Sequence, residues 1–374
     1  MPTNEDVADD LTMQDVQFDR ATVSERDAFN KELLALGALL VLTLKKNDPT
    51  APATAAGQAA RMEKYRVQVR LSVRGVYNKQ STRSTRFLVD MADMAARGTK
   101  RAVDAASGIN LFRRPFGPDK AKRIVESALV QGETSAAWWK AQAENYDQNL
   151  MRTLKVGLSE NENLSLLASR IRGTRLAGFG DGMVGLSQRQ AEGLIRTATL
   201  QTVNDSRLAM YEENDDVVRG VQAINPLDAR TSAICRSRAG AAWYLSTGQP
   251  LPGFSWVGMF PGAPPWHWAC RTVLVPVLRS ASALRNAASG GRGRRLRSEL
   301  DALNPRASKE LDGNPLPGMT FKQWIDRVDQ ATAREALGPT KLSMWRRGKI
   351  TTKDLVNQNG RPQTVAELKN KLGE

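Results

Sequence analysis

The sequence predicts a predominantly α-helical protein of the α+β class. Three observations support this class: helical spacing of apolar residues through residue 211, a Gly-, Pro- and Trp-rich stretch with short β-prone runs from 217 to 260, and a second helical stretch after 307. We therefore expect a helical N-terminal region, a small α+β domain and a small helical C-terminal module. A chain of 374 residues has room for two or three domains.

The first 50 residues are expected to hold an acidic arm followed by an apolar helix. Residues 1–27 are acidic within a basic chain, which favours a mobile arm or one that a partner orders. The longest apolar stretch, Leu33 to Leu44, is too short to span a bilayer. We therefore expect a buried or partner-facing helix there, and no association with a membrane.

Residues 51–117 are interpreted as a linker and a basic helical region. From 62 to 79 the apolar residues fit both an alternating strand and one helical face, and the helix-rich neighbourhood favours the helix. Arg66, Arg70 and Arg74 then stack four residues apart. This basic face is either solvated or a candidate for contact with DNA phosphates.

Residues 118–278 are expected to form one domain that begins with helices. The helical pattern continues to Tyr211, and two pairs have the spacing of a capping box: Ser159 with Glu162, and Ser187 with Gln190. Each pair predicts that a helix begins there.

The last of these helices has a polar face, which gathers four residues within roughly a quarter of the circumference: Arg196, Asn204, Arg207 and Tyr211. We expect this face to pack against groups that need hydrogen bonds. Residues 217–224 and 271–278 are predicted strands, and Pro276 places the second at the edge of a sheet.

Residues 279–306 are interpreted as a basic flexible linker, because the stretch 279–297 holds six arginines and no acidic residue. It is either a hydrophilic tether or a contact for nucleic acid. The candidates for DNA contact are Arg285, Arg292, Arg294, Arg295 and Arg297.

Residues 307–374 are predicted to form a helical module. Gly338 and Pro339 are expected to end one helix, and Thr364 with Glu367 to cap the last one.

Charge and cysteine content narrow the class of protein. The formal net charge is +15 and the pI about 10.1, which favours contact with nucleic acid or with acidic protein surfaces. Two cysteines argue against a disulfide scaffold and favour folding in a reducing compartment.

Two separated segments carry metal-ligating side chains, "NPLDARTSAIC" (225–235) and "PPWHWACR" (264–271). Cys235, His267 and Cys270 supply three candidate ligands of a structural zinc ion, and Asp228 is the candidate fourth. The spacing His-x-x-Cys lets one turn present both of its side chains.

Two other interpretations of these segments remain open. One is a clasp without metal, in which Asp228 pairs with Arg230 or Arg271, His267 donates to a backbone carbonyl and the cysteines pack as small hydrophobic residues. The other is a disulfide between the two cysteines. Because His267 is the only histidine, enzymes with two zinc-binding histidines are excluded, and no catalytic residue is predicted.

The same segments, with the helix before them, resemble the Mu F-like minor head proteins of tailed bacteriophages. The resemblance covers about Pro118 to Leu278 and follows the order of the family's motifs. An opening "VGLSENENLSLLASRIRG" is followed by a helix with a spaced Arg-Thr…Asn…Arg pattern, by an Asp-x-Arg-Thr…Cys segment, and by the closing Pro-Pro-x-His-x-x-Cys-Arg. The structural residues that match, besides the candidate ligands, are Arg196, Thr197, Asn204, Arg207, Arg230, Thr231, Pro264, Pro265 and Arg271.

The chain departs from the family pattern at two informative positions. Ala198 stands where many members have Glu, and Thr272 stands where many have a further Cys. The resemblance implies a minor component of the phage head interior, made in the host cytoplasm and associated with the portal. Its implied partners are the portal protein, the major capsid or scaffolding protein and double-stranded DNA, and its implied role is in head assembly and in DNA packaging or ejection.

Two further hypotheses belong to other classes. One is a metal-dependent nuclease or protease centred on His267, and the other is a general nucleic-acid-binding protein. The absence of a helix-turn-helix, zinc-finger or RNA-binding signature counts against the second.

Overall fold

The computed structural model describes residues 3–287, 290–317, 320–356 and 362–373. The chain forms two compact units, each built from separate stretches of sequence. The helical unit comprises Phe18–Asp90 and Val125–Thr199, and the mixed unit comprises Met1–Gln17, Met91–Ile124 and Leu200–Glu374. Helices predominate and the strands form two small sheets, so the predicted class, predominantly α-helical α+β, is confirmed.

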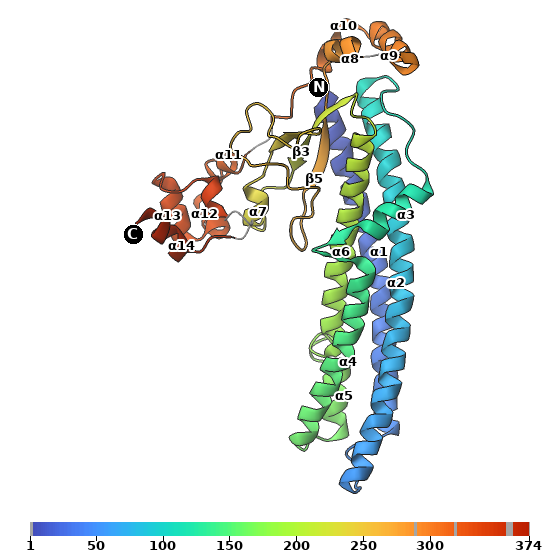
Figure 1. Cartoon of the computed structure of the whole chain (residues 1–374). Coiled ribbons are helices and arrows are strands. Elements are labelled where there is room, and N and C mark those ends of the chain that lie inside the picture. Colours follow the sequence, from blue (N-terminus) through green and yellow to red (C-terminus); the bar gives the residue numbers. More distant parts are fainter. Residues whose placement is uncertain (1–2, 288–289, 318–319, 357–361, 374) are drawn as a thin grey trace. The chain divides into compact units, whose positions relative to one another are not determined.

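In the helical unit, long helices lie side by side (Figure 1). They are parts of α1 (Thr3–Lys46), α2 (Ala55–Ser107) and α6 (Met183–Glu212), together with α4 (Ser135–Ser159). The basic stretch after residue 62 is therefore helical, as favoured from its pattern. The apolar stretch after Leu33 lies in α1, and its inward face is buried: Leu33, Leu36, Leu40 and Leu44.

An aromatic cluster occupies the core of this unit. Phe29 packs edge-on against Tyr77 and Trp139, with ring centroids 5.5 and 5.3 Å apart, and Tyr146 lies 6.4 Å from Tyr77. Each ring comes from a different turn of α1, α2 or α4. Large rings of this kind bury the most apolar area for each residue and dominate the packing energy.

In the helical unit, the residues at which the helices begin differ from those that the capping-box spacing predicted. A two-stranded hairpin of β1 (Leu129–Val130) and β2 (Glu133–Thr134) precedes α4, which Thr134 caps. The cap of α5 (Leu164–Arg172) is Asn163, so the predicted cap at Ser159 is wrong. The prediction at Ser187 is wrong as well, because α6 already begins at Met183.

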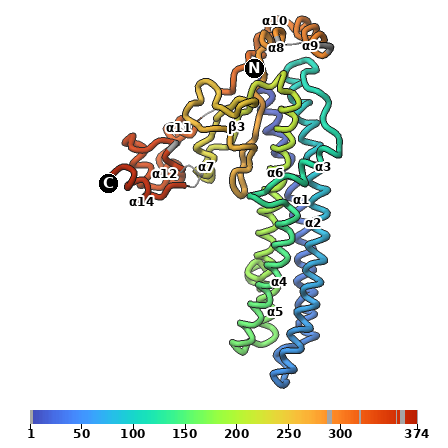
Figure 2. The backbone as a smooth tube through the Cα atoms, viewed as in Figure 1, coloured from blue at the N-terminus to red at the C-terminus, as the bar shows by residue number. Residues whose placement is uncertain are grey.

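In the mixed unit, an antiparallel sheet has the strand order β4-β3-β5. Its strands are β3 (Val218–Ile224), β4 (Ala242–Tyr244) and β5 (Val273–Leu278). Every residue of β5 is buried, and Pro276 lies on an edge strand as predicted. Between β4 and β5 the chain follows a long irregular path (Figure 2).

The first part of α1 also belongs to the mixed unit, where it is helical; of the two expectations for this acidic arm, mobile or ordered by a partner, the mobile one is wrong. Its apolar residues Val7 and Leu11 recur every four positions and are fully buried, and this burial outweighs the charge repulsion.

The stretch 279–306 was predicted to be a flexible linker, and it is helical instead. It contains α8 (Ala281–Ala287) and α9 (Gly290–Ala302), and α10 (Pro305–Glu310) begins at its end. Arg285 pairs with Asp301 of the same stretch at 2.9 Å and Arg292 with the distant Asp216 at 2.9 Å, so acidic residues hold these arginines in place.

The C-terminal helices form a compact module within the mixed unit, as predicted. They are α11 (Phe321–Ile325), α12 (Gln330–Leu337), α13 (Pro339–Arg346) and α14 (Val365–Leu372), with the short 3-10 helix η1 (Thr352–Leu355), and α7 (Ala233–Arg236) lies against η1. Gly338 ends α12 with a φ of 75°, and the predicted capping box of Thr364 and Glu367 begins α14.

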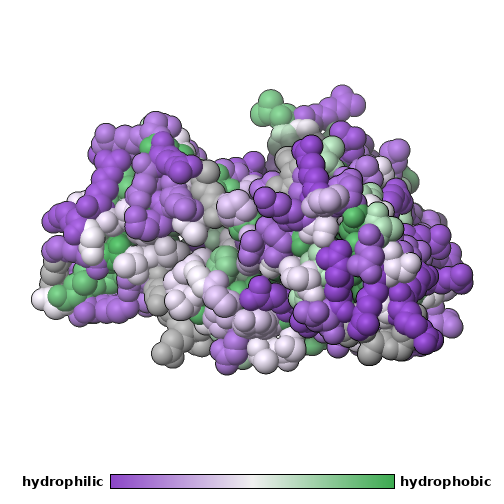
Figure 3. All heavy atoms as spheres, turned by 90° about the horizontal axis from the view of Figure 1, so that it is seen from above, coloured by the Kyte–Doolittle hydropathy of each residue, from purple (hydrophilic) through white to green (hydrophobic). Residues whose placement is uncertain are grey.

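The outer surface agrees with the polar composition. Hydrophilic side chains cover most of the face drawn in Figure 3, with hydrophobic ones in scattered groups. Within the described residues, no helix combines the length and apolar character that crossing a bilayer requires.

Candidate metal centre

Local structure brings the three sulfur and nitrogen ligands of the mixed unit together. Ser232 caps the short helix α7 by accepting a hydrogen bond from the backbone N–H of Cys235, which fixes where the first cysteine lies. The backbone N–H of Cys270 donates to the His267 carbonyl at 3.2 Å. This single turn presents His267 and Cys270 together, as their spacing predicted.

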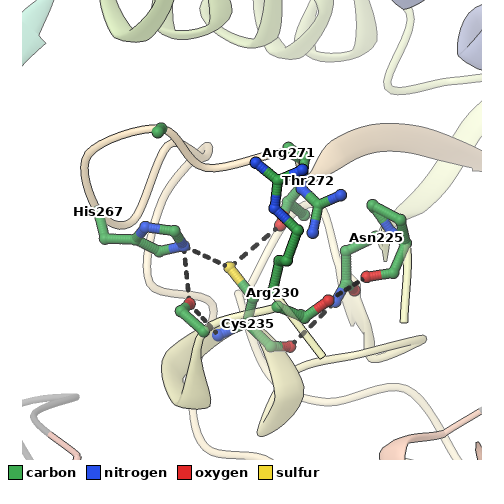
Figure 4. A pocket seen from close by; sticks show the side chains of 10 residues that line it. Asn225, Arg230, Cys235, His267, Arg271 and Thr272 are labelled. Atoms are coloured by element: carbon green, nitrogen blue, oxygen red, sulfur yellow. Dashed lines mark hydrogen bonds between the residues drawn. The ribbon is translucent and has the colours of Figure 1, made fainter. Parts of the chain in front are cut away.

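The ligand atoms converge closely. The sulfurs of Cys235 and Cys270 lie 3.5 Å apart, and His267 Nε2 lies 3.0 Å from the sulfur of Cys235. Figure 4 shows the imidazole pointing at that sulfur. All three ligand atoms lie within 4.8 Å of one another, so the group could hold a metal ion.

The histidine is oriented as a metal ligand is. Its Nδ1 lies 2.7 Å from the Trp268 carbonyl oxygen, to which a protonated Nδ1 donates. That donation leaves the lone pair of Nε2 directed at the sulfurs and at the Ser232 hydroxyl, which is 2.7 Å away. A carbonyl behind the imidazole is the usual way in which proteins fix the tautomer of a metal-bound histidine.

The dimensions fit zinc. Zinc–sulfur bonds of about 2.3 Å and zinc–nitrogen bonds of about 2.0–2.1 Å in a tetrahedron place two sulfurs about 3.8 Å apart, and sulfur and nitrogen about 3.6 Å apart. The observed distances of 3.5 and 3.0 Å are slightly shorter, so a small outward rotation of the side chains accommodates the ion.

Asp228 does not join the ligand cluster. Its carboxylate accepts two hydrogen bonds from Arg271, at 2.7 and 2.9 Å, and further ones from Thr231 and from the backbone N–H of Arg230. These bonds, with that of Arg271 the strongest, lower the pKa of Asp228 to about 2. The pairing with Arg271, one of the alternatives left open by the sequence, is the one that the structure shows.

Proton sharing ties the three ligands to one another. The pKa of Cys270 is lowered to about 4, chiefly because the Cys235 thiol donates to its sulfur, while the pKa of Cys235 is raised. The thiolate of Cys270 in turn raises the pKa of His267. The site thus already favours one negative sulfur, the form that a metal ion binds.

A small pocket adjoins the cluster. Its volume is about 20 Å³, and Cys235, His267 and Arg230 are among the residues that line it (Figure 4). This volume is enough for about one water molecule.

Two residues of the site were not predicted from the sequence. One is Ser232, whose position three residues before Cys235 is the only signal for it. The other is Thr272, which is fully buried and whose hydroxyl lies 3.4 Å from each sulfur. Its signal was the departure from the family pattern, where many members have a cysteine.

Most of the other residues that match the Mu F-like motifs lie around this centre. Asn204 on α6 accepts from the backbone N–H of Leu274 at 3.0 Å and donates to the Thr272 carbonyl at 3.2 Å, which fastens α6 to the start of β5. The Tyr211 hydroxyl donates to the Leu274 carbonyl at 2.9 Å. The polar face predicted for this helix therefore meets hydrogen-bonding groups.

Arg207 on the same face is fully buried and donates to the Leu11 carbonyl, and it pairs with Asp15 at 2.6 Å. Pro264 and Pro265, joined by a cis peptide bond, are buried ahead of His267. Of the two tryptophans beside His267, Trp266 packs under Arg238, whereas Trp268 is 41% exposed.

Two motif residues belong to the helical unit and not to this centre. Arg196 pairs with Asp19 at 3.4 Å, and the Thr197 hydroxyl donates to the Gly193 carbonyl at 2.7 Å.

The candidate DNA contacts are distributed over both units. In the helical unit Arg66 pairs with Glu63 and Arg70 with Asp147, whereas Arg74 is exposed. In the mixed unit Arg295 pairs with Glu299, and Arg294 and Arg297 are exposed. Within each unit, acidic neighbours therefore pair with some of the candidate arginines and leave others exposed.

No family model, curated protein or solved structure matches this chain.

Proposed function

We propose that this chain is a non-enzymatic minor head protein of a tailed bacteriophage. One observation carries the proposal: three separated segments that resemble the Mu F-like motif meet at one place in the mixed unit. Asn204 holds the start of β5, Asp228 holds Arg271, and Cys235 meets His267 and Cys270. A motif that arose by chance would not be expected to place its residues in mutual contact.

In this role the chain lies inside the phage head, in contact with the portal and with the major capsid or scaffolding protein. Mass spectrometry of purified phage heads, followed by cryo-electron microscopy of the procapsid, tests the proposal. The expected result is density for this chain beside the portal. Recovery of the protein only from uninfected host cytoplasm would point to a cellular nucleic-acid-binding protein instead.

We propose that double-stranded DNA is a further partner. The charge of +15 supports this, as do the exposed arginines Arg74 and Arg294. Because each neutralised phosphate releases counterions, binding should weaken by about 10³-fold or more between 50 and 200 mM salt if six or more phosphates are contacted. A filter-binding titration measures this slope, and affinity that does not change with salt would contradict direct contact.

We further propose that Cys235, His267 and Cys270 hold a structural zinc ion. Elemental analysis of the purified protein should find about one zinc per chain, as expected for a single structural site. His267→Ala should lose the zinc and destabilise the mixed unit, because the free energy of metal binding contributes to folding.

Thr272→Cys gives a gain-of-function test of the same site. The Thr272 hydroxyl already lies 3.4 Å from both sulfurs, so a thiolate there would complete a set of four ligands. The variant should bind zinc more tightly in competition with a chelator. Thr199→Cys is the matched control, since Thr199 is equally buried but lies in the helical unit.

One observation favours a second candidate function, a metal-dependent hydrolase. Three protein ligands with room beside them for one water is the pattern of catalytic zinc sites. Zinc-loaded protein that cleaves DNA or a peptide substrate, and loses that activity with a chelator, would establish it. If the zinc-loaded protein cleaves neither DNA nor the peptide, the zinc ion has a structural role.

A further inference from the structure

The two cysteines of the candidate metal centre are placed for a reaction with each other. They are the only cysteines in the chain, and their sulfurs lie 3.5 Å apart. A disulfide requires about 2.05 Å between sulfurs, a gap that rotation about the two side-chain bonds can close. Cys235 on α7 and Cys270 before β5 are each 3% exposed, so the cysteines of a second chain do not compete.

The same two sulfurs are the metal ligands of the proposed zinc site. A sulfur in a disulfide has no negative charge to offer a metal ion, so the two states exclude each other. We propose that Cys235 and Cys270 form a reversible redox pair, in which a disulfide and a metal-bound dithiolate alternate. The metal half of this inference rests on the zinc site proposed above.

The oxidation is balanced with a peroxide as the oxidant. The Cys235 thiol passes its proton to solvent and its sulfur attacks one peroxide oxygen, the O–O bond breaks, and a sulfenic acid and hydroxide form. The Cys270 thiolate then attacks the Cys235 sulfur, the S–S bond forms, and a second hydroxide leaves. Two protons from solvent convert the hydroxides to water and the zinc ion is released. A dithiol supplies the two electrons and two protons that reverse the reaction.

The geometry assigns the two sulfurs different parts in this sequence. Cys235 lines the small pocket, whereas Cys270 is not among the residues that line it. A small oxidant that enters the pocket therefore meets the Cys235 sulfur first. Cys270 lies behind it at 3.5 Å, in the place of a resolving thiol.

The redox pair would make the state of the metal site depend on how reducing the surrounding compartment is. In a reducing cytoplasm the thiols and the metal persist, and outside the cell the disulfide is favoured. In either state a bond joins α7 to the start of β5, so the clasp stays closed when the metal leaves. A protein that is assembled in one compartment and carried into the other would need such a clasp.

The test uses the purified full-length protein and hydrogen peroxide. We expect both free thiols to disappear together, with a mass loss of about 2 Da from two hydrogens. One proteolytic fragment should link Cys235 to Cys270, and a colorimetric zinc indicator should report release in step with thiol loss. Dithiothreitol with added zinc should restore the starting state.

His267→Asn and Cys270→Ser separate the possible causes. His267→Asn keeps both sulfurs and removes a metal ligand, so it should form the same disulfide more readily and release no zinc. Cys270→Ser lacks the resolving thiol, so Cys235 should stop at the sulfenic acid, which dimedone traps. If either variant fails to fold, the peroxide experiment on the wild-type protein still tests the redox pair.

The outcomes distinguish this inference from the zinc proposal. If the reduced protein holds no zinc but peroxide still forms the Cys235–Cys270 disulfide, the redox pair stands and the zinc site is overturned. Zinc that stays bound while both thiols resist peroxide, or cysteines that become sulfinic acids or link separate chains, would overturn the redox pair and leave the zinc site standing.

Discussion

The aromatic cluster of the helical unit and the polar face of α6 in the mixed unit are held in place by different kinds of contact. In the helical unit, buried rings and leucines such as Phe29, Trp139 and Leu40 pack on one another. In the mixed unit, the buried side chains Asn204, Arg207 and Tyr211 on α6 bond to backbone groups of other segments. Apolar packing accepts many partners of similar volume, whereas a directed hydrogen bond accepts one. We therefore expect the mixed unit to be much less tolerant of conservative substitution.

The largest effect is expected at the buried ion pair of the mixed unit. Arg207→Met leaves the largely buried Asp15 carboxylate without its counter-charge, which should lower the free energy of unfolding by about 3–5 kcal/mol. Urea unfolding followed by circular dichroism measures this loss. Arg196→Met on the same helix is the matched control, since its pair with Asp19 is exposed and should contribute less than about 1 kcal/mol.

A double variant sharpens that test. Adding Asp15→Leu to Arg207→Met removes both charges, so most of the lost stability should return. If the double variant is as unstable as the single one, the pair acts through the hydrogen bond to Leu11 and not through charge.

The second prediction compares the loss of stability when one buried polar group is removed from each unit. Asn204→Ala removes two buried hydrogen bonds to the β5 region and should lower the free energy of unfolding by about 2–3 kcal/mol. Tyr146→Phe keeps the ring in the helical core and removes a buried hydroxyl that has no hydrogen-bond partner within the described residues. It should be neutral or slightly stabilising. Equal losses in the two variants would remove the contrast between the units.

The third prediction is a gain in stability on replacing Asp205, and its size depends on pH. Burial is the main cause that raises the pKa of Asp205 to about 6. Folding therefore favours the protonated acid, and the cost of the charged form grows as pH rises from about 4 to about 6. Asp205→Asn should stabilise the protein by about 1–3 kcal/mol at pH 8 and by almost nothing at pH 3.5. Thermal unfolding at the two pH values measures the difference, and an equal change at both would contradict the assignment to charge.

The smallest effect is expected at Asp228. Its pKa is lowered to about 2, mainly by Arg271, so its contribution to stability is present above about pH 4 and is lost as pH falls towards 2. The pair is partly exposed, and Asp228→Asn should therefore cost less than about 1 kcal/mol at pH 7. Zinc content should not change, and its loss would make Asp228 a ligand after all.

Much of the fold could be predicted because its signals are periodic. Apolar spacing predicted the long helices, and Pro276 predicted an edge strand, since both depend on local rules. The helix starts at Met183 and Asn163 were missed, because Ser and Gln or Glu at the right spacing occur inside helices as well. The helices α8 and α9 were missed because the prediction rested on the stretch 279–297, whereas the acidic partners Glu299 and Asp301 follow it and Asp216 lies far away in the sequence.

Three of the four candidate ligands were predicted correctly from the sequence, but the groups that hold them in place were not. Cys235, His267 and Cys270 were recognised because the chain has only one histidine and two cysteines, and two of the three are close in the sequence. Asp228 and Arg271 are far apart in the sequence, and the spacing of residues along the chain does not show that folding brings them together. The Trp268 carbonyl behind His267 is a backbone group, and no residue type signals it.

The division of the chain between the units has a consequence for synthesis on the ribosome. The last residue of the helical unit is Thr199, so that unit can close while the rest is still being translated. The mixed unit must wait longer, because Asn4 accepts a hydrogen bond from the backbone N–H of Leu278 and donates one to the carbonyl of Asn314. The first turn of α1 is therefore made long before its partners Leu278 and Asn314, an interval in which a chaperone or an assembly partner has access to Val7.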